Sequence, residues 1–374
     1  MNKSGKPVQK KRVHKKRLAL LLPGKDEELI IAATIRSAIA AGQKREDIFV
    51  VDDGSTDKTR KEALKELPKK NVLSVVGGGK AKAVMQGIDH FKIEERYTWV
   101  HVADADSVFG PDYFRIYRKN LHAKKYAVAL GFVQSLRGNW ISHYRAVTYT
   151  YSQHIFRRFQ SYLGMISVFP GPITCFKTSI LKDLEFDGNS LTEDFDITLQ
   201  VHRKKLGKIK FIPEAINYTQ DPQTLRDFIK QNQRWQRGFF QGFLKYRVGT
   251  KLQALDIGLV YQITEIVFYL LQMFVLIPFV LIQTGNWQLL PAIFVADFLV
   301  VAVLAVFSAV AAKRLTALLC LPYFFFLRTV ELGVFIQAFF EVVILRKYRN
   351  EIRGWDVAGR RYALDENALK DVAQ

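Results

Sequence analysis

The sequence predicts an α/β domain followed by a C-terminal helical transmembrane domain. Residues 17–135 alternate short apolar runs with segments of helical spacing, which is the pattern of a parallel, doubly wound sheet. After about residue 255 the chain becomes apolar over stretches long enough to cross a bilayer. Pairs of aspartates follow two of the predicted strands, where ligands bind in this class of sheet. A chain of 374 residues is long enough for both parts.

The α/β part contains four apolar runs that read as strands bounded by turn-forming residues. The predicted strands are 18–24, 47–53, 71–76 and 97–106. The predicted helices between them are 26–42, 56–67 and a segment that begins near Lys80. Because the carboxyl ends of parallel strands lie at one edge of a sheet, the aspartates at the ends of these strands should gather there. These residues are Asp52, Asp53, Asp104 and Asp106.

Two apolar stretches, 257–283 and 288–312, are each long enough to cross a bilayer, although Glu265 lies inside the first. Two such lengths in tandem favour a membrane over buried core helices. A third stretch, 315–345, is interrupted by one proline and three charged residues: Pro322, Arg328, Glu331 and Glu341. We expect it to be re-entrant, a broken pair of short helices or a single crossing. Ionisable side chains in these stretches should face protein or water.

The chain is basic, with a formal net charge of +20, and the excess is concentrated at its start. The first 17 residues hold eight Lys or Arg and no acid, so this segment should be disordered. Three interpretations of this segment are open: a solvated tail, a segment attracted to anionic lipid, and a nucleic-acid binder. The apolar stretches later in the chain favour attraction to lipid. The positive-inside rule places the basic half, Lys313-Arg314 and the tail from Arg346 on the cytoplasmic side, which requires an even number of crossings.

Cysteine usage and glycine spacing exclude several classes of protein. Cys175 and Cys320 give neither a disulfide framework nor a metal pattern, and they suit a reducing compartment. No signal peptide is expected. The glycines at 77–79 follow the third predicted strand and lack the spacing of a dinucleotide-binding loop.

Two acidic motifs follow predicted strands, and each has a structural and a chemical interpretation. In "VVDDGSTD" two carboxylates end a strand before a glycine turn, and a helix capped by Ser55 or Thr56 explains the motif equally well. In "DADS" the two aspartates are two positions apart, so alternation sends both carboxylates to one side of the chain. Two such oxygens can hold a divalent cation that also binds phosphate oxygens, whereas the alternative is an acidic turn.

A third acidic motif, "LTEDFDITL", packs Glu193, Asp194 and Asp196 into four positions. Locally it is typical of a helix start, with Thr192 as the N-cap and acids that suit the helix dipole. The order of the motifs along the chain instead favours chemistry at Asp194. Both interpretations can hold together, with Thr192 capping the helix that presents Asp194.

The segment "QNQRW" places Arg234 and Trp235 just before the membrane region. Arg can fork onto phosphate and Trp can offer a stacking face, whereas the alternative is a snorkelling Arg beside an interfacial Trp. The next segment, 239–256, begins with "FFQGFLKYRV" and is expected to be an amphipathic helix at the membrane interface.

In this order, the motifs and the apolar helices resemble the membrane-integrated family 2 glycosyltransferases, which include hyaluronan, chitin, cellulose and poly-N-acetylglucosamine synthases. The resemblance covers about residues 17–345 and extends to "PGKDE", "GKAKA" and "GPITCFKTSIL". It implies a GT-A-type, Rossmann-like α/β glycosyltransferase domain followed by a C-terminal helical transmembrane domain. The protein is then expected in the cell membrane, multi-pass, with a cytoplasmic catalytic domain. The expected divisions are a basic disordered tail (1–16), the glycosyltransferase domain (17–238), an interfacial helix (239–256), a transmembrane region (257–345) and a basic cytoplasmic tail (346–374).

The resemblance implies a metal-dependent, inverting hexosyltransferase that uses a UDP-sugar, with an N-acetylglucosamine-type donor favoured. Asp194 would be the general base on the acceptor hydroxyl, with Glu193 as the second catalytic carboxylate. The implied donor-binding residues are Pro23, Glu27, Asp52, Asp53, Lys80, Asp104 and Arg234. The implied acceptor-binding residues are Gly171, Thr174, Gln231 and Trp235. Mg²⁺ or Mn²⁺ would be held by Asp104 and Asp106.

The favoured function is processive synthesis of a β-linked polysaccharide coupled to its translocation. The alternative is non-processive transfer of a sugar to a membrane lipid, such as a diacylglycerol or polyprenyl phosphate, which the small membrane region favours. A non-enzymatic membrane adaptor or nucleic-acid binder would leave the ordered acidic motifs without a role, so no nucleic-acid partner is expected. The expected partners are the UDP-sugar, a growing glycan or lipid acceptor, membrane lipids and an accessory subunit or second copy.

The chain departs from the family pattern at several positions. Met85 stands where the family often has Asn, and Gln220 stands in "TQDP" where the family often has Thr-Glu-x-Pro. No membrane helix is expected before the catalytic domain, unlike in most members, which puts a polymer channel built by this chain alone in doubt. Trp355 with Arg360-Arg361 loosely resembles a gating segment of the family, although a plain basic tail explains them better.

Overall fold

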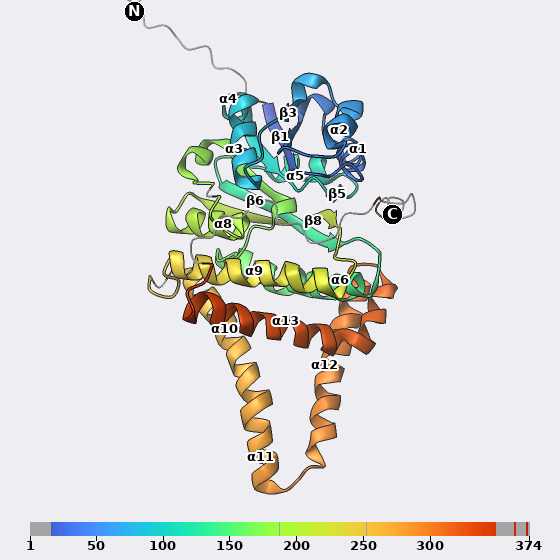
Figure 1. Ribbon diagram of the computed structural model, residues 1–374, viewed down its shortest axis with the longest axis vertical. Coiled ribbons are helices and arrows are strands. Elements are labelled where there is room, and N and C mark those ends of the chain that lie inside the picture. The colour runs from blue at the N-terminus through green and yellow to red at the C-terminus, as the bar shows by residue number, and fades with distance from the viewer. Residues whose placement is uncertain (1–15, 187, 252, 349–362, 364–371, 373–374) are drawn as a thin grey trace, which may run out of the picture.

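The computed structural model describes residues 16–348, apart from 187 and 252, and also residues 363 and 372. The basic tail before residue 16 and the residues Trp355, Arg360 and Arg361 lie outside the described part. Figure 1 shows three tiers: a sheet covered by helices, a layer of helices that lie crosswise beneath it, and a helical hairpin that projects from this layer.

The upper tier is built on an eight-stranded mixed sheet with the order β3-β2-β1-β4-β7-β6-β8-β5. The strands are β1 (Lys16–Gly24), β2 (Ile48–Asp52), β3 (Val72–Ser74), β4 (Tyr97–Val102), β5 (Val108–Phe109), β6 (Tyr126–Ser135), β7 (Thr174–Lys177) and β8 (Lys208–Thr219). Strands β1 to β4 are mutually parallel, as predicted. The parallel arrangement fails at β7, which is antiparallel to β4 and β6, and at β5, which is antiparallel to β8. Both are short strands whose direction is set by distant partners and not by a local pattern.

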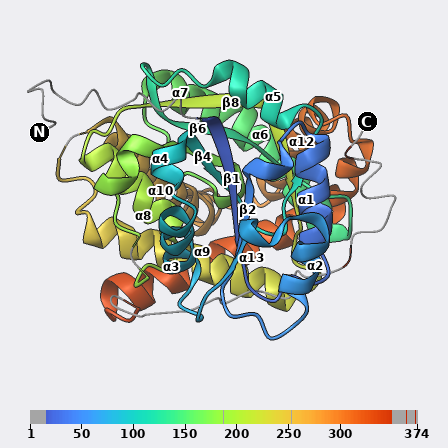
Figure 2. The ribbon, with the colours of Figure 1, turned by 90° about the horizontal axis from the view of Figure 1, so that it is seen from above.

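Helices cover both faces of this sheet (Figure 2). They are α1 (Ile31–Ala40), α2 (Thr59–Glu66), α3 (Lys80–His90), α4 (Ile93–Arg96), α5 (Tyr113–Asn120) and α8 (Glu193–Arg203), with short turns η1 (Arg45–Asp47), η2 (Lys69–Asn71), η4 (Gly171–Ile173) and η5 (Thr178–Asp183). Leu21 of β1 joins the core that contains α3, α4 and α8, and Leu20 joins the core that contains α1, α2 and α5. Because both faces are buried, the strands read as continuous apolar runs.

The middle tier lies between the sheet and the hairpin. It consists of α6 (Trp140–Tyr151) with its continuation through η3 (Ser152–Arg157) and α7 (Arg158–Leu163), α9 (Leu225–Lys245), and α13 (Phe324–Phe339) with its continuation η8 (Phe340–Ile344). Figure 1 shows α9 and α13 side by side, crosswise to the hairpin. Phe240 and Phe335 join them, with ring centroids 5.0 Å apart. Ion pairs connect Arg237 to Glu341 at 2.7 Å and Arg145 to Glu331 at 3.3 Å. Polar and apolar contacts therefore dock α13 against the helices above it.

The helix α9 begins at Leu225 and ends at Lys245, whereas the predicted interfacial helix began at residue 239 and continued to 256. Thr224 caps the start by accepting a hydrogen bond from the Asp227 N–H at 3.1 Å. Phe228 is buried and extends the apolar face upstream. The prediction placed a boundary where the composition changes, but the helix runs through that point without a break.

The hairpin consists of α10 (Ala254–Leu271), η6 (Gln272–Leu276) and α11 (Ile277–Thr284) on one side and α12 (Leu289–Ala311) on the other. Both sides are long and apolar enough to cross a membrane, and so is the stretch Leu315–Ile344 by the same measure. The hairpin exposes large apolar side chains, including Phe274 at 67% and Val303 at 68%. The third stretch is divided at Tyr323 into η7 (Leu315–Tyr323) and α13, in agreement with the broken pair of short helices expected among the alternatives.

A buried ion pair joins the hairpin to the α/β domain. Arg203, the last residue of α8, donates to both carboxylate oxygens of Asp256, at 2.5 and 2.9 Å. The same guanidinium donates to Gln253 Oε1 at 2.6 Å. Gln253 and Asp256 together form the capping box of α10. One side chain of the α/β domain therefore fixes the point at which the hairpin begins.

Replacing Arg203 with alanine should leave Asp256 buried without its cation and lower the free energy of unfolding by about 3–5 kcal/mol. Thermal unfolding of the detergent-purified chain measures this loss. Lys204→Ala is the matched control, because Lys204 pairs with the exposed Glu185 and should change stability by about 1 kcal/mol or less. Equal losses in the two variants would contradict the role given to Arg203.

Candidate active site

A cavity of about 500 Å³ lies between the carboxyl edge of the sheet, α8 and α9, and it reaches the first helix of the hairpin. Its wall contains eight of the residues that the sequence indicated for the site: Lys80, Asp104, Gly171, Glu193, Asp194, Gln231, Arg234 and Trp235. Leu259 and Gln262 of α10 also belong to the wall. The volume lies within the usual range for small-molecule sites.

Lys80 stands between two carboxylates that come from different parts of the domain. It is the first residue of α3, and its Nζ lies 2.5 Å from Asp104 Oδ1 and 3.0 Å from Glu193 Oε1. Burial by itself would lower the pKa of Lys80, but the two carboxylates raise it above its ordinary value. The ammonium therefore stays charged and connects the edge of β4 with the start of α8.

Asp53 shapes the glycine loop that leads to Lys80. Its side chain is fully buried, and its two oxygens accept hydrogen bonds from the Gly78 N–H at 3.0 Å and the Gly79 N–H at 2.8 Å. Gly79 has a φ of +88°, in the left-handed region that favours glycine, and it immediately precedes α3. The buried carboxylate thus holds the backbone that delivers Lys80 to the cavity.

Asp52 closes the turn after β2. One oxygen accepts from the Ser55 N–H and the other from the Ser74 hydroxyl, both at 3.0 Å. Neither Ser55 nor Thr56 caps the next helix, because α2 begins later, at Thr59. The capping interpretation of this motif is therefore wrong, and its aspartates organise loops at the edge of the sheet.

Six of the indicated residues are not among those that line the cavity in the described part of the chain: Pro23, Glu27, Asp52, Asp53, Asp106 and Thr174. Asp106 is buried in the turn after β4. The Thr174 hydroxyl donates to the Pro170 carbonyl at 2.7 Å, and Pro170 itself lines the cavity. Thr174 therefore supports the wall from behind.

The carboxylate of Asp104 lines the cavity, where its Oδ1 contacts Lys80. Within the residues that the structure describes, no group of three or more His, Cys, Asp or Glu side chains is arranged to hold a metal ion. A cation here would take few protein ligands, and Mg²⁺ and Mn²⁺ suit that arrangement because they bind carboxylate, water and phosphate oxygens. Gly171 leaves the space open, since an added Cβ would lie only 3.0 Å from Asp104 Oδ1. The residues present therefore fit such an ion.

The helix α8 presents the acidic motif to the cavity, but its start is not capped as predicted. Thr192 occupies the N-cap position without a side-chain capping bond, so that prediction is wrong. Its side chain packs instead against Gly238 of α9, where an added Cβ would lie 2.9 Å from the Thr192 Cβ. The Thr192 hydroxyl is buried at this contact between the two helices and has no hydrogen-bond partner among the described residues.

Glu193 and Asp194 are neighbours whose pKa values shift in opposite directions. Burial and the negative charge of Glu193 raise the pKa of Asp194 to about 6. Burial also acts on Glu193, but Lys80 and Arg234 outweigh it and hold the pKa of Glu193 below its ordinary value. Separated pKa values in adjacent carboxyl groups are typical of acid–base sites, and Asp194 is the member closer to neutral pH.

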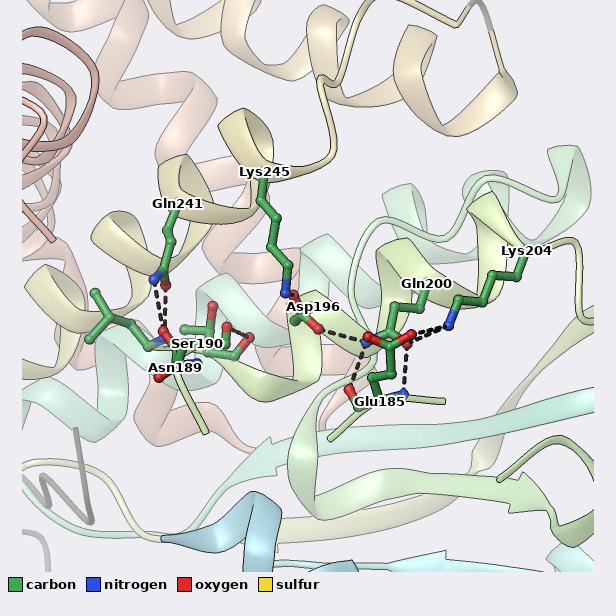
Figure 3. Close-up of polar contacts among 10 residues, drawn as sticks. Glu185, Asn189, Ser190, Asp196, Gln200, Lys204, Gln241 and Lys245 are labelled. Carbon is green, nitrogen blue, oxygen red and sulfur yellow. Dashed lines mark hydrogen bonds and ion pairs between the residues drawn. The ribbon is translucent and has the colours of Figure 1, made fainter. Parts of the chain in front are cut away.

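The third acid of the motif, Asp196, has a structural role. Figure 3 shows it between Lys245 of α9 and Gln200 of α8, each of which donates to it at 2.7 Å. Gln241 of α9 holds the loop before α8, where its Nε2 donates to the Asn189 carbonyl at 2.8 Å (Figure 3). The helix α9 therefore fixes the segment that carries the acidic motif on both sides.

The side chains of Gln231, Arg234 and Trp235 project from α9 into the cavity wall. Arg234 Nη1 donates to the Leu191 carbonyl at 3.4 Å, beside the acidic motif, which is contrary to a snorkelling role. Arg145 of α6 supports the other two, since its guanidinium carbon lies 4.9 Å from the Trp235 ring centroid and its Nη2 lies 3.4 Å from Gln231 Oε1. These contacts orient the motif toward the cavity.

The sequence analysis did not place several of the residues that line the cavity in the site. They are Tyr149, Ser152, Gln153 and Arg157 of α6 and η3, Gln220 after β8, and Gln262 of α10. The helical ones fall in segments with the pattern of ordinary amphipathic or membrane helices. Only the tertiary fold brings them to the cavity, so no local signal could have identified them. Gln220 was noticed only as a departure from a family motif, and the structure shows it buried.

Over residues 99–328, the chain matches the sequence model of a family described as glycosyl transferase family group 2. It is 28% identical over 259 residues to the poly-β-1,6-N-acetyl-D-glucosamine synthase of Staphylococcus epidermidis, a match that covers 67% of this chain and 61% of that protein. The synthase of the same description from Staphylococcus aureus (strain COL) is 26% identical over 235 residues, which cover 61% of this chain and 56% of that protein. The matches therefore span less than two thirds of the length of these relatives.

Among solved structures, the chain is similar to a mannosyltransferase from Pyrobaculum calidifontis in complex with GDP-mannose and Mn²⁺. The TM-score is 0.53 at 14% sequence identity, and the alignment covers 82% of this chain and 86% of that chain. At this identity the likeness shows the fold alone. It confirms the GT-A-type α/β domain that the sequence predicted.

Gly171→Ala should disturb the contact between Lys80 and Asp104, because the new Cβ would lie 2.8 Å from Lys80 Nζ and 3.0 Å from Asp104 Oδ1. We expect the affinity for UDP with Mn²⁺ to fall about tenfold, equivalent to about 1.4 kcal/mol, in isothermal titration calorimetry. Gly188→Ala is the control, since Gly188 lines the same cavity and a Cβ there would meet nothing within 4 Å. The prediction is refuted if both variants bind UDP as the unmodified chain does.

Proposed function

Because this chain belongs to glycosyl transferase family group 2, we propose that it transfers a sugar from a UDP-sugar to an acceptor hydroxyl with inversion at the anomeric carbon. The proposed donor is of the N-acetylglucosamine type and the proposed product is a β-linked polysaccharide, since the relatives found are poly-β-1,6-N-acetyl-D-glucosamine synthases. The observation that carries the proposal is the position of Lys80. It sets the donor-side carboxylate Asp104 beside the pair Glu193 and Asp194 in one cavity.

On the donor side, the cavity offers positive charge where a leaving diphosphate would gain negative charge. Lys80 and Arg234 line this region and would bind the diphosphate. A divalent cation held by Asp104 and Asp106 would supply further stabilisation of the leaving group. The uridine would lie against the ends of β1 and β2 and the loops that follow them, which carry the remaining proposed donor residues: Pro23, Glu27, Asp52 and Asp53.

On the acceptor side, Asp194 would take the proton from the attacking sugar hydroxyl. A carboxylate with a raised pKa is a stronger base than an ordinary aspartate, and Glu193 stays ionised beside it to maintain that shift. Trp235 offers a ring on which the acceptor sugar can stack, next to Gln231. Direct attack from the face opposite the diphosphate inverts the anomeric carbon, so an α-linked donor gives a β-linkage.

The tiers of the fold support a proposal for the membrane arrangement. We propose that the hairpin crosses the bilayer and that α13 lies along its cytoplasmic surface beneath α9. Within the described residues this gives two crossings, which agrees with the even number that the positive-inside rule requires and would leave the α/β domain in the cytoplasm. The hairpin alone does not surround a polymer, so we propose that export also uses a second copy or an accessory subunit. Transfer to a membrane lipid is the second candidate, because Leu259 and Gln262 of α10 belong to the cavity wall.

The proposal is tested by assaying UDP release from each UDP-sugar by the purified chain with Mg²⁺ or Mn²⁺, followed by sizing of the product. We expect release from UDP-N-acetylglucosamine. A long, glycosidase-sensitive polymer would identify a polysaccharide synthase, and a short product that partitions with lipid would identify a lipid glycosyltransferase. Absence of UDP release from every donor, with a lipid extract present as acceptor, would count against the proposed reaction.

Asp194→Asn should lower turnover by about 10²- to 10⁴-fold and leave UDP affinity nearly unchanged, because asparagine keeps the shape but cannot accept the proton. Steady-state kinetics and calorimetry measure the two effects. Asp196→Asn is the contrasting variant, since Asp196 pairs with Lys245 at 2.7 Å away from the chemistry. It should lower the melting temperature and retain turnover. A loss of UDP affinity in Asp194→Asn equal to its loss of turnover would argue against the base role.

The raised pKa of Asp194 also predicts how the reaction depends on pH. A general base acts only when ionised, so kcat/KM should rise with pH and level off above about pH 6. Because the folded-state pKa lies above the unfolded value, ionising Asp194 removes stability between about pH 4 and pH 6. At about pH 7.5, Asp194→Asn should therefore melt at a higher temperature than the unmodified chain. A rate profile whose acidic limb is centred near pH 4 would be inconsistent with this assignment.

A further inference from the structure

Arg157 is a cation in the cavity wall without a partner in the described part of the chain. It is the last residue of η3, and its Nη1 is inaccessible to solvent and has no hydrogen-bond partner there. Burial lowers the pKa of Arg157 to about 10, which still leaves the guanidinium charged at neutral pH. The residue as a whole is partly exposed, but its Nη1 is shielded from solvent. A charge held there without a counter-charge costs free energy, so its position indicates a ligand that supplies one.

Other arginines between the sheet and the hairpin differ from Arg157 in this respect. Ion pairs join Arg145 to Glu331, Arg203 to Asp256 and Arg237 to Glu341. Each of these pairs connects two elements of the fold and has an evident structural role. Arg157 makes no comparable contact among the described residues, so packing of the chain does not explain it.

The segment that carries Arg157 is fixed by the fold. Gln153, about one turn earlier, bonds both the N–H and the carbonyl of Val133 in β6, at 2.9 and 2.7 Å. Residues 152–157 form a π-helix, a wide turn that is frequent at functional sites. Figure 2 shows its continuation, α7, beside β8. The backbone segment that carries Arg157 is therefore held against the sheet by the side chain of Gln153.

The same segment faces the apolar part of the molecule. Ile155, Phe156 and Phe159 are exposed, and the His154 ring lies 6.1 Å from the ring of Phe307 in α12. The cavity wall that contains Arg157 also includes Leu259 and Gln262 of α10. A molecule anchored by an apolar chain beside the hairpin can therefore place a polar head group in the cavity.

We propose that Arg157 binds the phosphate of a lipid-linked acceptor on the membrane side of the cavity, an inference that rests on the proposed transfer reaction and specifies its acceptor. A phosphate matches guanidinium in charge and in its paired oxygens. Neutral sugar hydroxyls would not offset the charge, and the donor diphosphate has cations of its own in Lys80 and Arg234. The sugar hydroxyl of such an acceptor would then be presented to Asp194.

The test measures ligand binding by the full chain in detergent. Dioctanoyl phosphatidic acid is the lipid phosphate probe, dioctanoylglycerol the uncharged lipid, inorganic phosphate the free anion, and UDP with Mn²⁺ the donor-site probe. We expect Arg157→Gln to weaken phosphatidic acid binding about tenfold or more and Arg157→Lys to weaken it less. Arg158→Gln is the matched control, because Arg158 is the exposed neighbour, and it should bind as the unmodified chain does. UDP affinity should be the same in all three variants.

Equal binding of phosphatidic acid by the unmodified chain and Arg157→Gln would overturn the inference, as would a parallel loss of UDP affinity. Binding of inorganic phosphate or dioctanoylglycerol as tight as that of phosphatidic acid would overturn the lipid phosphate assignment. Because Arg157 lacks a protein partner, Arg157→Gln should melt at or above the temperature of the unmodified chain, so unfolding would not account for lost binding. A chain that binds phosphatidic acid through Arg157 but does not bind UDP would refute the proposed transferase and leave the phosphate site standing.

Discussion

The ammonium group of Lys80 holds the two sides of the active site together. Without it, Asp104, Glu193 and Asp194 would be carboxylates facing one cavity, and their repulsion would favour separation of α8 from the sheet. With it, the Nζ of Lys80 lies within 3.0 Å of a carboxylate oxygen of both Asp104 and Glu193, and Asp194 remains beside the ionised Glu193. Burial and the ionised Glu193 raise the pKa of Asp194, and Lys80 contributes by keeping Glu193 ionised, although its charge acts on Asp194 in the opposite direction. Asp53 fixes the position of Lys80 through the glycine loop.

The helix α9 carries this arrangement toward the membrane. Its upper face supplies Arg234 and Trp235 to the cavity and Lys245 to the acidic helix, and its lower face packs Phe240 against α13. The acid Glu341 is neutralised by Arg237 of the same helix. The charged residues of the third apolar stretch therefore have partners on neighbouring helices, since Glu331 pairs with Arg145 of α6 and Arg328 pairs with Asp297 of α12. These pairings depend on the tertiary fold, which explains why the sequence alone was compatible with several topologies.

The sequence predicted those parts of the structure whose signals are local. Strands β1 to β4 follow from period and turn residues, and Lys80 and Asp194 reach the cavity because their motifs lie at helix starts. The features that were missed depend on distant segments. The direction of β7 is set by its neighbours in the sheet, and the Thr192 side chain packs against Gly238 of α9. Arg157 resembles any basic residue of an amphipathic helix, because a sequence does not show whether an arginine has a partner.

Two glycines of α9 remain to be placed in this account. Gly238 and Gly242 are four residues apart, so they lie on one face of the helix, where α8 crosses it. An added Cβ at Gly242 would lie 2.8 Å from the Phe195 ring, and the first turn of α8 would have to move. Substitutions that are tolerated among the aliphatic residues of the hairpin are therefore not tolerated at Gly238 and Gly242, although neither glycine lines the cavity. In a distant homologue, glycine at these two positions would indicate that α8 and α9 still pack closely enough to form the site.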